Sequence, residues 1–202
     1  QLKMFDPDLV DLLLERSRAA GIEIISAATP EKIEAAGKAQ RIVYGKDGNT
    51  QVKEADLMVH GAGRVPAVDE LNLSAAGIDT DNGGVKVTPW LQSTSNPRIY
   101  AAGDAAASPG KPWTPVAVFE GKIAISNMLK GKQTEPDYTG VPSVVFTISE
   151  LARVGMLEEE ARETGDVEVS FTDTSGWFSQ KRLGETHAGA KIISDTEGKI
   201  LG

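Results

Sequence analysis

The sequence RIYAAGD at residues 98–104, followed by Thr114-Pro115 and a helical run, decides how the chain is expected to fold. It predicts a buried strand, a tight turn, a carboxylate and then a helix N-terminus. Asp104 can accept hydrogen bonds, and backbone N–H groups at a helix N-terminus face electron-rich atoms. The segment therefore predicts a site for a ligand that carries hydroxyls and phosphates.

The helix after this segment is expected to have Thr114 as its N-cap and Pro115 as its first residue. It should end near Lys130, because Gly131 follows. Five apolar residues at helical spacing predict its buried face: Val116, Phe119, Ile123, Ala124 and Met128.

The first 60 residues predict one helix followed by several short strands. Asp6 and Pro7 mark the start of a helix that ends near residue 20. A Lys-Asp-Gly-Asn turn at residues 46–49 predicts a hairpin. Strands are expected at residues 22–25, 32–35, 41–44, 50–53 and 56–60.

Two segments predict domain boundaries. The sequence GAGRVP at residues 61–66 follows a predicted strand, and its glycines and proline interrupt regular structure. The polar segment 132–139 contains Pro136 and predicts a second boundary near Gly140.

The remaining elements are short. Residues 67–78 are expected to be irregular or weakly helical, and residues 94–97 to form a turn. A helix is expected at residues 157–164, and strands are expected at residues 84–87, 143–147, 167–172, 190–194 and 199–201.

Composition excludes several classes of protein. The 202 residues are 40% hydrophobic, carry a net charge of −8 and include no cysteine. Acidity without a basic patch argues against nucleic-acid binding, and the absence of thiols excludes a thiolate nucleophile within these residues. No apolar run predicts a membrane span and no signal sequence is recognisable, so a cytoplasmic location is the expectation. The ends at Gln1 and Gly202 suggest a fragment.

Four stretches in a fixed order resemble the flavin-dependent pyridine nucleotide-disulfide oxidoreductases. They are GRVP at 63–66, LSAAGIDTDNGG at 73–84, IYAAGD at 99–104 and VPSVVFTISELARVG at 141–155. The resemblance covers almost the whole chain, and it implies that the chain is the C-terminal part of such an enzyme.

The resemblance implies an α/β fold with an α+β C-terminal part. Residues 1–65 would be the C-terminal portion of the NAD(P)-binding domain, and residues 66–138 the C-terminal segment of the FAD-binding domain. Residues 139–202 would begin a truncated α+β interface domain, through which the family dimerises. The family's first glycine motif and redox cysteines would lie upstream, and its catalytic His and Glu downstream.

The same resemblance assigns cofactor contacts. Gly103 and Asp104 would bind the ribityl chain of FAD, although an aspartate after glycine also caps ordinary turns. Thr114 and Val116 would lie at the flavin pyrimidine edge, where the positive end of the helix dipole stabilises the reduced ring. A plain surface helix with an ordinary cap is the alternative.

The glycine-containing segment at residues 61–66 has two interpretations. By resemblance, Gly63 would lie beside the nicotinamide nucleotide and Arg64 near the junction of the two cofactor sites. Alternatively, they only turn the chain between domains. Ala67 follows Pro66 where the family often has Asn, and the TPVA sequence at 114–117 is most similar to the glutathione and trypanothione reductase branch.

No metal site is expected. His60 and His187 are isolated from carboxylates at ligand spacing and are expected to be structural. Phe146, Phe171, Trp177 and Phe178 are expected to be core or interface aromatics.

The resemblance therefore implies part of an enzyme that passes electrons from NAD(P)H through FAD to a disulfide or related acceptor, inactive as this chain alone. The alternative is a non-catalytic assembly module in which residues from about 139 onward form a homodimer.

Overall fold

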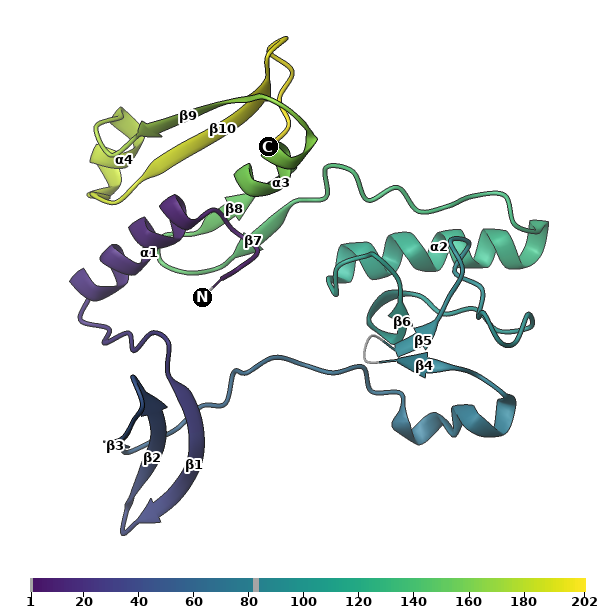
Figure 1. Cartoon of the computed structure of the whole chain (residues 1–202), viewed down its shortest axis with the longest axis horizontal. Helices are drawn as coiled ribbons and strands as arrows, with labels where there is room; N and C mark the ends of the chain where they lie inside the picture. Colours follow the sequence, from purple (N-terminus) through teal and green to yellow (C-terminus); the bar gives the residue numbers. More distant parts are fainter. Residues whose placement is uncertain (1, 82–83) are drawn as a thin grey trace. The chain divides into compact units, whose positions relative to one another are not determined.

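The chain forms two compact units, seen in a computed structural model that describes residues 2–81 and 84–202 (Figure 1). A middle unit comprises His60–Thr139, and an outer unit joins Gln1–Val59 to Gly140–Gly202. The division into three domains at residues 65 and 138 stays a prediction.

Part of one motif falls outside the described residues. Asn82 and Gly83 belong to the LSAAGIDTDNGG stretch, and they are outside the described ranges together with Gln1. Within residues 2–81 and 84–202, no helix is both long and apolar enough to cross a bilayer.

The middle unit combines one long helix with a small mixed sheet. Strand β5 (Gly84–Lys86) pairs antiparallel with β4 (Thr80–Asp81) and parallel with β6 (Ala106–Ala107). The predicted irregular segment contains two 3-10 turns, η1 (Asp69–Leu71) and η2 (Leu73–Ala76), which confirms weak helicity there.

Helix α2 (Thr114–Lys130) confirms the predicted long helix but begins one residue earlier than expected. Trp113 is the N-cap, because it has extended backbone angles and its carbonyl accepts from the Ala117 amide at 2.9 Å. Thr114 is therefore already helical, and Pro115 occupies the second position, where its missing N–H costs nothing.

The buried face of α2 differs from the predicted one. Val116, Ile123 and Ala124 are buried as expected, and the last two pack with Leu91 in the core of the unit. Phe119 and Met128, which were predicted on this face, are 39% and 56% exposed. Two polar residues take their places: Glu120 and Asn127.

Asn127 ties the end of α2 to the segment that follows it. Its amide nitrogen donates to the carbonyls of Trp90 and Thr134, at 3.1 and 2.7 Å. Its amide oxygen accepts from the backbone N–H groups of Gln133 and Thr134. One buried side chain thus satisfies four backbone groups that lie outside regular structure.

The segment before Gly103 is not the strand that was predicted. Tyr100 forms a single β-bridge with Gln92, flanked by hydrogen bonds from Ser93 N to Ile99 O and from Ala101 N to Leu91 O. These contacts satisfy its backbone without a continuous strand.

The outer unit begins with helix α1 (Pro7–Ala19) and an antiparallel meander. The predicted strands and hairpin are confirmed as β1 (Thr29–Ala36), β2 (Ala39–Lys46) and β3 (Asn49–Ala55), joined in the order β1-β2-β3. The strands predicted at residues 22–25 and 56–60 are wrong, because neither segment pairs with a strand in the described chain.

The rest of the outer unit contains two hairpins and two short helices. Its sheets pair β7 (Ser143–Val145) with β8 (Leu151–Arg153) and β9 (Val167–Asp173) with β10 (Gly189–Asp195). Helix α3 (Glu158–Thr164) lies where a helix was predicted. Strand β8 and helix α4 (Phe178–Leu183) were not predicted.

Helix α1 packs against β8 and β10, so the start of the chain contacts its last strand (Figure 1). Phe5, Val10, Leu13 and Leu151 form a shared core. The observed fold is therefore mixed α/β with small sheets, and the assignment of partial nucleotide-binding folds stays a prediction.

Adjacent residues of β10 provide a test of this packing. Ile193 is 1% exposed and Ile192 is 49% exposed, because successive strand residues face opposite sides. We expect Ile193→Ala to lower the free energy of unfolding by about 2–5 kcal/mol through loss of buried contacts. Ile192→Ala is the matched control, measured by urea denaturation; equal losses from both substitutions would contradict this packing.

Candidate functional site

A cavity in the middle unit gathers four of the six predicted cofactor contacts. Its volume is about 440 Å³, and its lining includes Gly63, Arg64, Gly103 and Asp104. These residues come from two segments far apart in the sequence. The fold therefore brings the GRVP segment at residues 63–66 and the turn at the end of the IYAAGD segment to the same cavity.

The turn at Gly103 requires a residue without a side chain. Gly103 has φ of 64°, in the left-handed region, and begins the 3-10 turn η3 (Gly103–Ala105). A Cβ atom on Gly103 would lie 2.7 Å from the Cβ of Ala117 in α2. The glycine thus allows the turn to pack directly against the first turns of the helix.

Asp104 directly follows this glycine and is exposed at the cavity. An exposed carboxylate accepts hydrogen bonds from hydroxyl groups without the desolvation cost of a buried charge. Its placement therefore suits a polyhydroxylated ligand.

Thr114 and Val116 lie in the first turn of α2 and do not line this cavity. Thr114 is exposed, but the side chain of Val116 is buried at 4% exposure. Val116 can therefore offer a ligand its backbone N–H and not its side chain. The first turn of a helix carries about half a positive elementary charge, which favours an anionic group there.

Gly63 and Arg64 form another part of the lining. Gly63 adopts φ of 96°, which explains glycine at this bend. The Arg64 guanidinium donates to the carbonyl of Pro112 at 3.5 Å, a long contact from an exposed side chain. Arg64 thus brings a positive charge to the cavity that contains the Asp104 carboxylate.

Glu120, the most deeply buried charged residue of this unit, was not among the predicted site residues. Its side chain is 0% exposed. Its carboxylate accepts hydrogen bonds from the Gly103 amide, the Ser108 hydroxyl and the Tyr138 hydroxyl, each at 2.6 Å. Its position could have indicated this role. Glu120 lies one turn after Val116 on the apolar face of the helix, and a charged side chain on a buried face requires hydrogen-bond partners.

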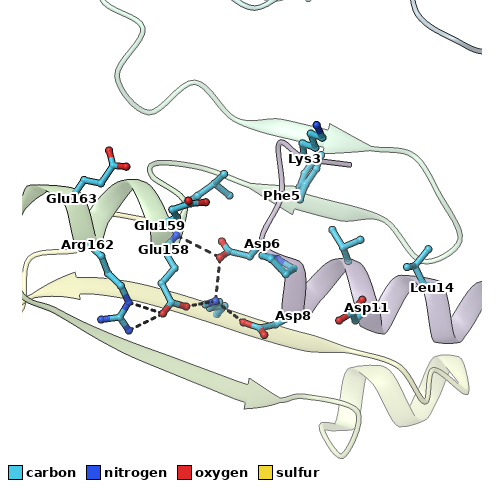
Figure 2. Close-up of a pocket in the computed structure, with 14 residues that line it drawn as sticks. Lys3, Phe5, Asp6, Asp8, Asp11, Leu14, Glu158, Glu159, Arg162 and Glu163 are labelled. Carbon is cyan, nitrogen blue, oxygen red and sulfur yellow. Dashed lines mark hydrogen bonds and ion pairs between the residues drawn. The ribbon is translucent and has the colours of Figure 1, made fainter. Parts of the chain in front are cut away.

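A larger cavity, of about 1040 Å³, lies in the outer unit between α1 and α3 (Figure 2). Figure 2 shows that Asp6, Asp8 and Glu158 converge on one cation. That cation is Lys191, whose Nζ lies 3.1 Å from Asp6, 2.5 Å from Asp8 and 2.5 Å from Glu158.

The Lys191 cluster is an electrostatic cross-link between the two ends of the chain. The Lys191 side chain is 3% exposed. Burial disfavours its charge, but hydrogen bonds to Asp8, Glu158 and Asp6 outweigh burial and hold its pKa above the ordinary value. Because its donors are already used within the protein, this lysine is not available as a ligand-binding group.

Glu185 forms a second polar cluster in the outer unit, with a side chain that is 10% exposed. It accepts hydrogen bonds from the Ser149 hydroxyl and the His187 backbone, and Arg16 lies 3.4 Å away. The Ser149 hydroxyl is the largest cause that lowers its pKa to about 2, followed by the His187 amide.

Within the described ranges, no group of three His, Asp or Glu side chains could hold a metal ion.

A family model described as pyridine nucleotide-disulphide oxidoreductase matches residues 1–121. The chain belongs to this family. The glutathione reductase branch suggested by residues 114–117 stays a prediction, as do the cofactor contacts.

Individual relatives agree with this family. The chain is 44% identical to an uncharacterized 19.7 kDa protein in a mercuric resistance operon of Staphylococcus aureus, over 63% of this chain and 71% of that protein. It is 34% identical to a mercuric reductase of Lysinibacillus sphaericus, over 100% of this chain and 37% of that enzyme.

A solved structure shares the fold. The HOCl-induced flavoprotein disulfide reductase RclA from Escherichia coli superposes with a TM-score of 0.83 and 28% identity, over 99% of this chain. The chain spans 45% of RclA, so it corresponds to less than half of that protein.

The depressed pKa of Glu185 predicts a specific acid sensitivity. Because the folded pKa is about 2 and the ordinary value 4.5, its contribution to stability is complete above pH 4.5 and is lost as pH falls toward 2. We expect Glu185→Gln to lower the melting temperature at neutral pH and to flatten its decline below pH 4.5.

Thermal unfolding followed by circular dichroism across this pH range measures the effect. Glu163→Gln, at an exposed position on α3, is the control and should leave the profile unchanged. Parallel pH profiles for Glu185→Gln and the unsubstituted protein would show that Glu185 does not contribute in this way.

Proposed function

We propose that this chain is part of a flavoenzyme that passes electrons from NAD(P)H through FAD to a disulfide or related acceptor. The main support is the cavity that gathers Gly63, Arg64, Gly103 and Asp104, in a member of the pyridine nucleotide-disulfide oxidoreductase family. Similarity to a mercuric reductase and to a flavoprotein disulfide reductase supports the same class of reaction.

The donor and acceptor groups of the cavity fit the polar part of FAD. The Asp104 carboxylate can accept hydrogen bonds, and Arg64 provides a positive charge. When bound, the flavin supplies the hydride and electron-transfer chemistry. The protein's part in this proposal is to bind and orient it.

Each predicted contact then has a distinct role. Asp104 and Gly103 hold the ribityl hydroxyls. The backbone N–H groups of Thr114 and Val116, at the positive end of α2, stabilise negative charge at the edge of the ring. Gly63 and Arg64 lie toward the NAD(P)H site.

The thiol step requires groups that these residues do not provide. The 202 residues include no cysteine, so they cannot form a thiolate or a redox disulfide. We therefore propose that this chain alone does not reduce disulfides and acts together with thiols from elsewhere. A cytoplasmic location is part of the same proposal.

Substitution of Asp104 tests the assignment of the cavity. Loss of a hydrogen bond to a charged group costs about 1.5–3 kcal/mol, so Asp104→Ala should weaken FAD binding about tenfold or more. Flavin fluorescence titration of the purified chain measures this. Asp69→Ala removes another exposed carboxylate of the middle unit and should bind like the unsubstituted chain. Unchanged FAD affinity in Asp104→Ala would refute the assignment.

A second candidate function is a non-catalytic assembly module, favoured by exposed apolar side chains after residue 139. Phe146, Ile148 and Phe178 are 89%, 82% and 81% exposed. Apolar surface of this kind is a common feature of protein interfaces. We propose that this part of the outer unit forms a homodimer, in which these side chains become buried.

Sedimentation velocity tests the homodimer. The chain should sediment as a dimer, and the double substitution Phe146→Ser with Phe178→Ser should shift it toward monomer. Leu57→Ser is the control, because Leu57 is 73% exposed but lies before the proposed interface region. A monomer at every concentration measured, or a dimer unaffected by the double substitution, would exclude this interface.

A further inference from the structure

The carboxylate of Glu120 on α2 binds two other segments of the middle unit: the loop at residues 103–108 and the segment that contains Tyr138. One oxygen accepts from the Gly103 amide, and the other accepts from the hydroxyls of Ser108 and Tyr138. Gly103 and Ser108 lie on either side of Asp104, and Tyr138 belongs to the last residues of the unit. One side chain thus fixes the loop around Asp104 at two points.

This arrangement is energetically demanding. A fully buried carboxylate is strongly destabilising unless hydrogen bonds replace its hydration, and here three donors do so. Burial, followed by the hydrogen bond to Glu120, raises the pKa of Tyr138 to about 12, so its hydroxyl remains protonated and can donate at neutral pH. All three donors are therefore available under physiological conditions.

The surroundings of Glu120 are tightly packed. A Cβ atom on Gly110 would lie 2.9 Å from Cε1 of Tyr138 and 3.0 Å from Cγ1 of Val116, and it would overlap the Glu120 carboxylate. Ser108 also accepts from the Gly110 amide at 3.2 Å. The loop between Gly103 and Gly110 therefore has little room to move while the Glu120 contacts are intact.

We propose that Glu120 is a positioning residue of the cofactor site, which holds the Gly103–Asp104 turn in the geometry that binds the ligand. Glu120 is not part of the cavity lining, so it acts through the Gly103 amide and the Ser108 hydroxyl. This inference rests on the proposed function, since it assumes that the turn binds FAD.

Two substitutions of Glu120 distinguish its role in holding the Gly103–Asp104 turn from a requirement for its negative charge. In Glu120→Gln the amide oxygen can still accept from the Gly103 N–H, and the amide nitrogen can donate to the Ser108 and Tyr138 hydroxyl oxygens. Glu120→Ala removes all three contacts. Glu135→Ala is the matched control, because Glu135 is exposed in the same unit.

The experiment combines FAD titration with hydrogen–deuterium exchange of the Gly103 amide. We expect Glu120→Ala to weaken FAD binding about tenfold or more and to speed Gly103 exchange by a similar factor. Glu120→Gln should restore both values to within about threefold of the unsubstituted chain, because hydrogen bonds rather than charge hold the turn. The visible circular dichroism spectrum of bound flavin should change in Glu120→Ala and should be unchanged in Glu120→Gln.

The outcomes separate this inference from the proposed function. If the unsubstituted chain does not bind FAD, the proposed function fails for this chain, while Gly103 exchange still decides whether Glu120 holds the turn. If Glu120→Ala does not fold, Ser108→Ala replaces it, because it removes one of the two contacts through which Glu120 acts on the loop; unchanged FAD affinity together with unchanged Gly103 exchange in that variant would overturn the inference. Normal FAD affinity and a protected Gly103 amide in folded Glu120→Ala would also overturn it.

Discussion

The close contact between the Gly103 turn and helix α2 is the constraint on which the middle unit depends. Gly103 meets Ala117 with no room for a side chain, and its backbone amide is held by Glu120 from the next turn of the same helix. The small residues Gly103 and Ala117 allow the close contact, and the buried Glu120 carboxylate holds the Gly103 amide in place. This contact determines where Asp104 stands relative to the start of α2.

The sequence was sufficient for features that depend on local chemistry. Glycine before an aspartate, proline near a helix start and an Asp-Gly hairpin turn each correspond to the observed structure. The strands expected at residues 22–25 and 56–60 failed for a different reason. Runs of β-branched and apolar residues favour extended backbone, but a strand also requires a pairing partner, and Ile22 and Leu57 are instead exposed.

The buried face of α2 illustrates the limit of hydrophobic patterns. Phe119 fits the apolar stripe better than Glu120 by hydrophobicity, yet Glu120 is the buried residue because three donors satisfy its carboxylate. Two of those donors come from side chains distant in sequence. The Lys191 cluster has the same character, since its carboxylates lie near the start of the chain and on α3. Such pairings depend on the three-dimensional fold.

The polar segment after α2 is held against that helix by two of its side chains. Its composition is that of a flexible spacer, but Asn127 binds the backbone at Gln133 and Thr134, and Glu120 binds the Tyr138 hydroxyl. The segment is thus fastened near both ends to the helix that it follows. The course of residues 133–138 is therefore set by two side chains of α2 and not by the composition of the segment itself.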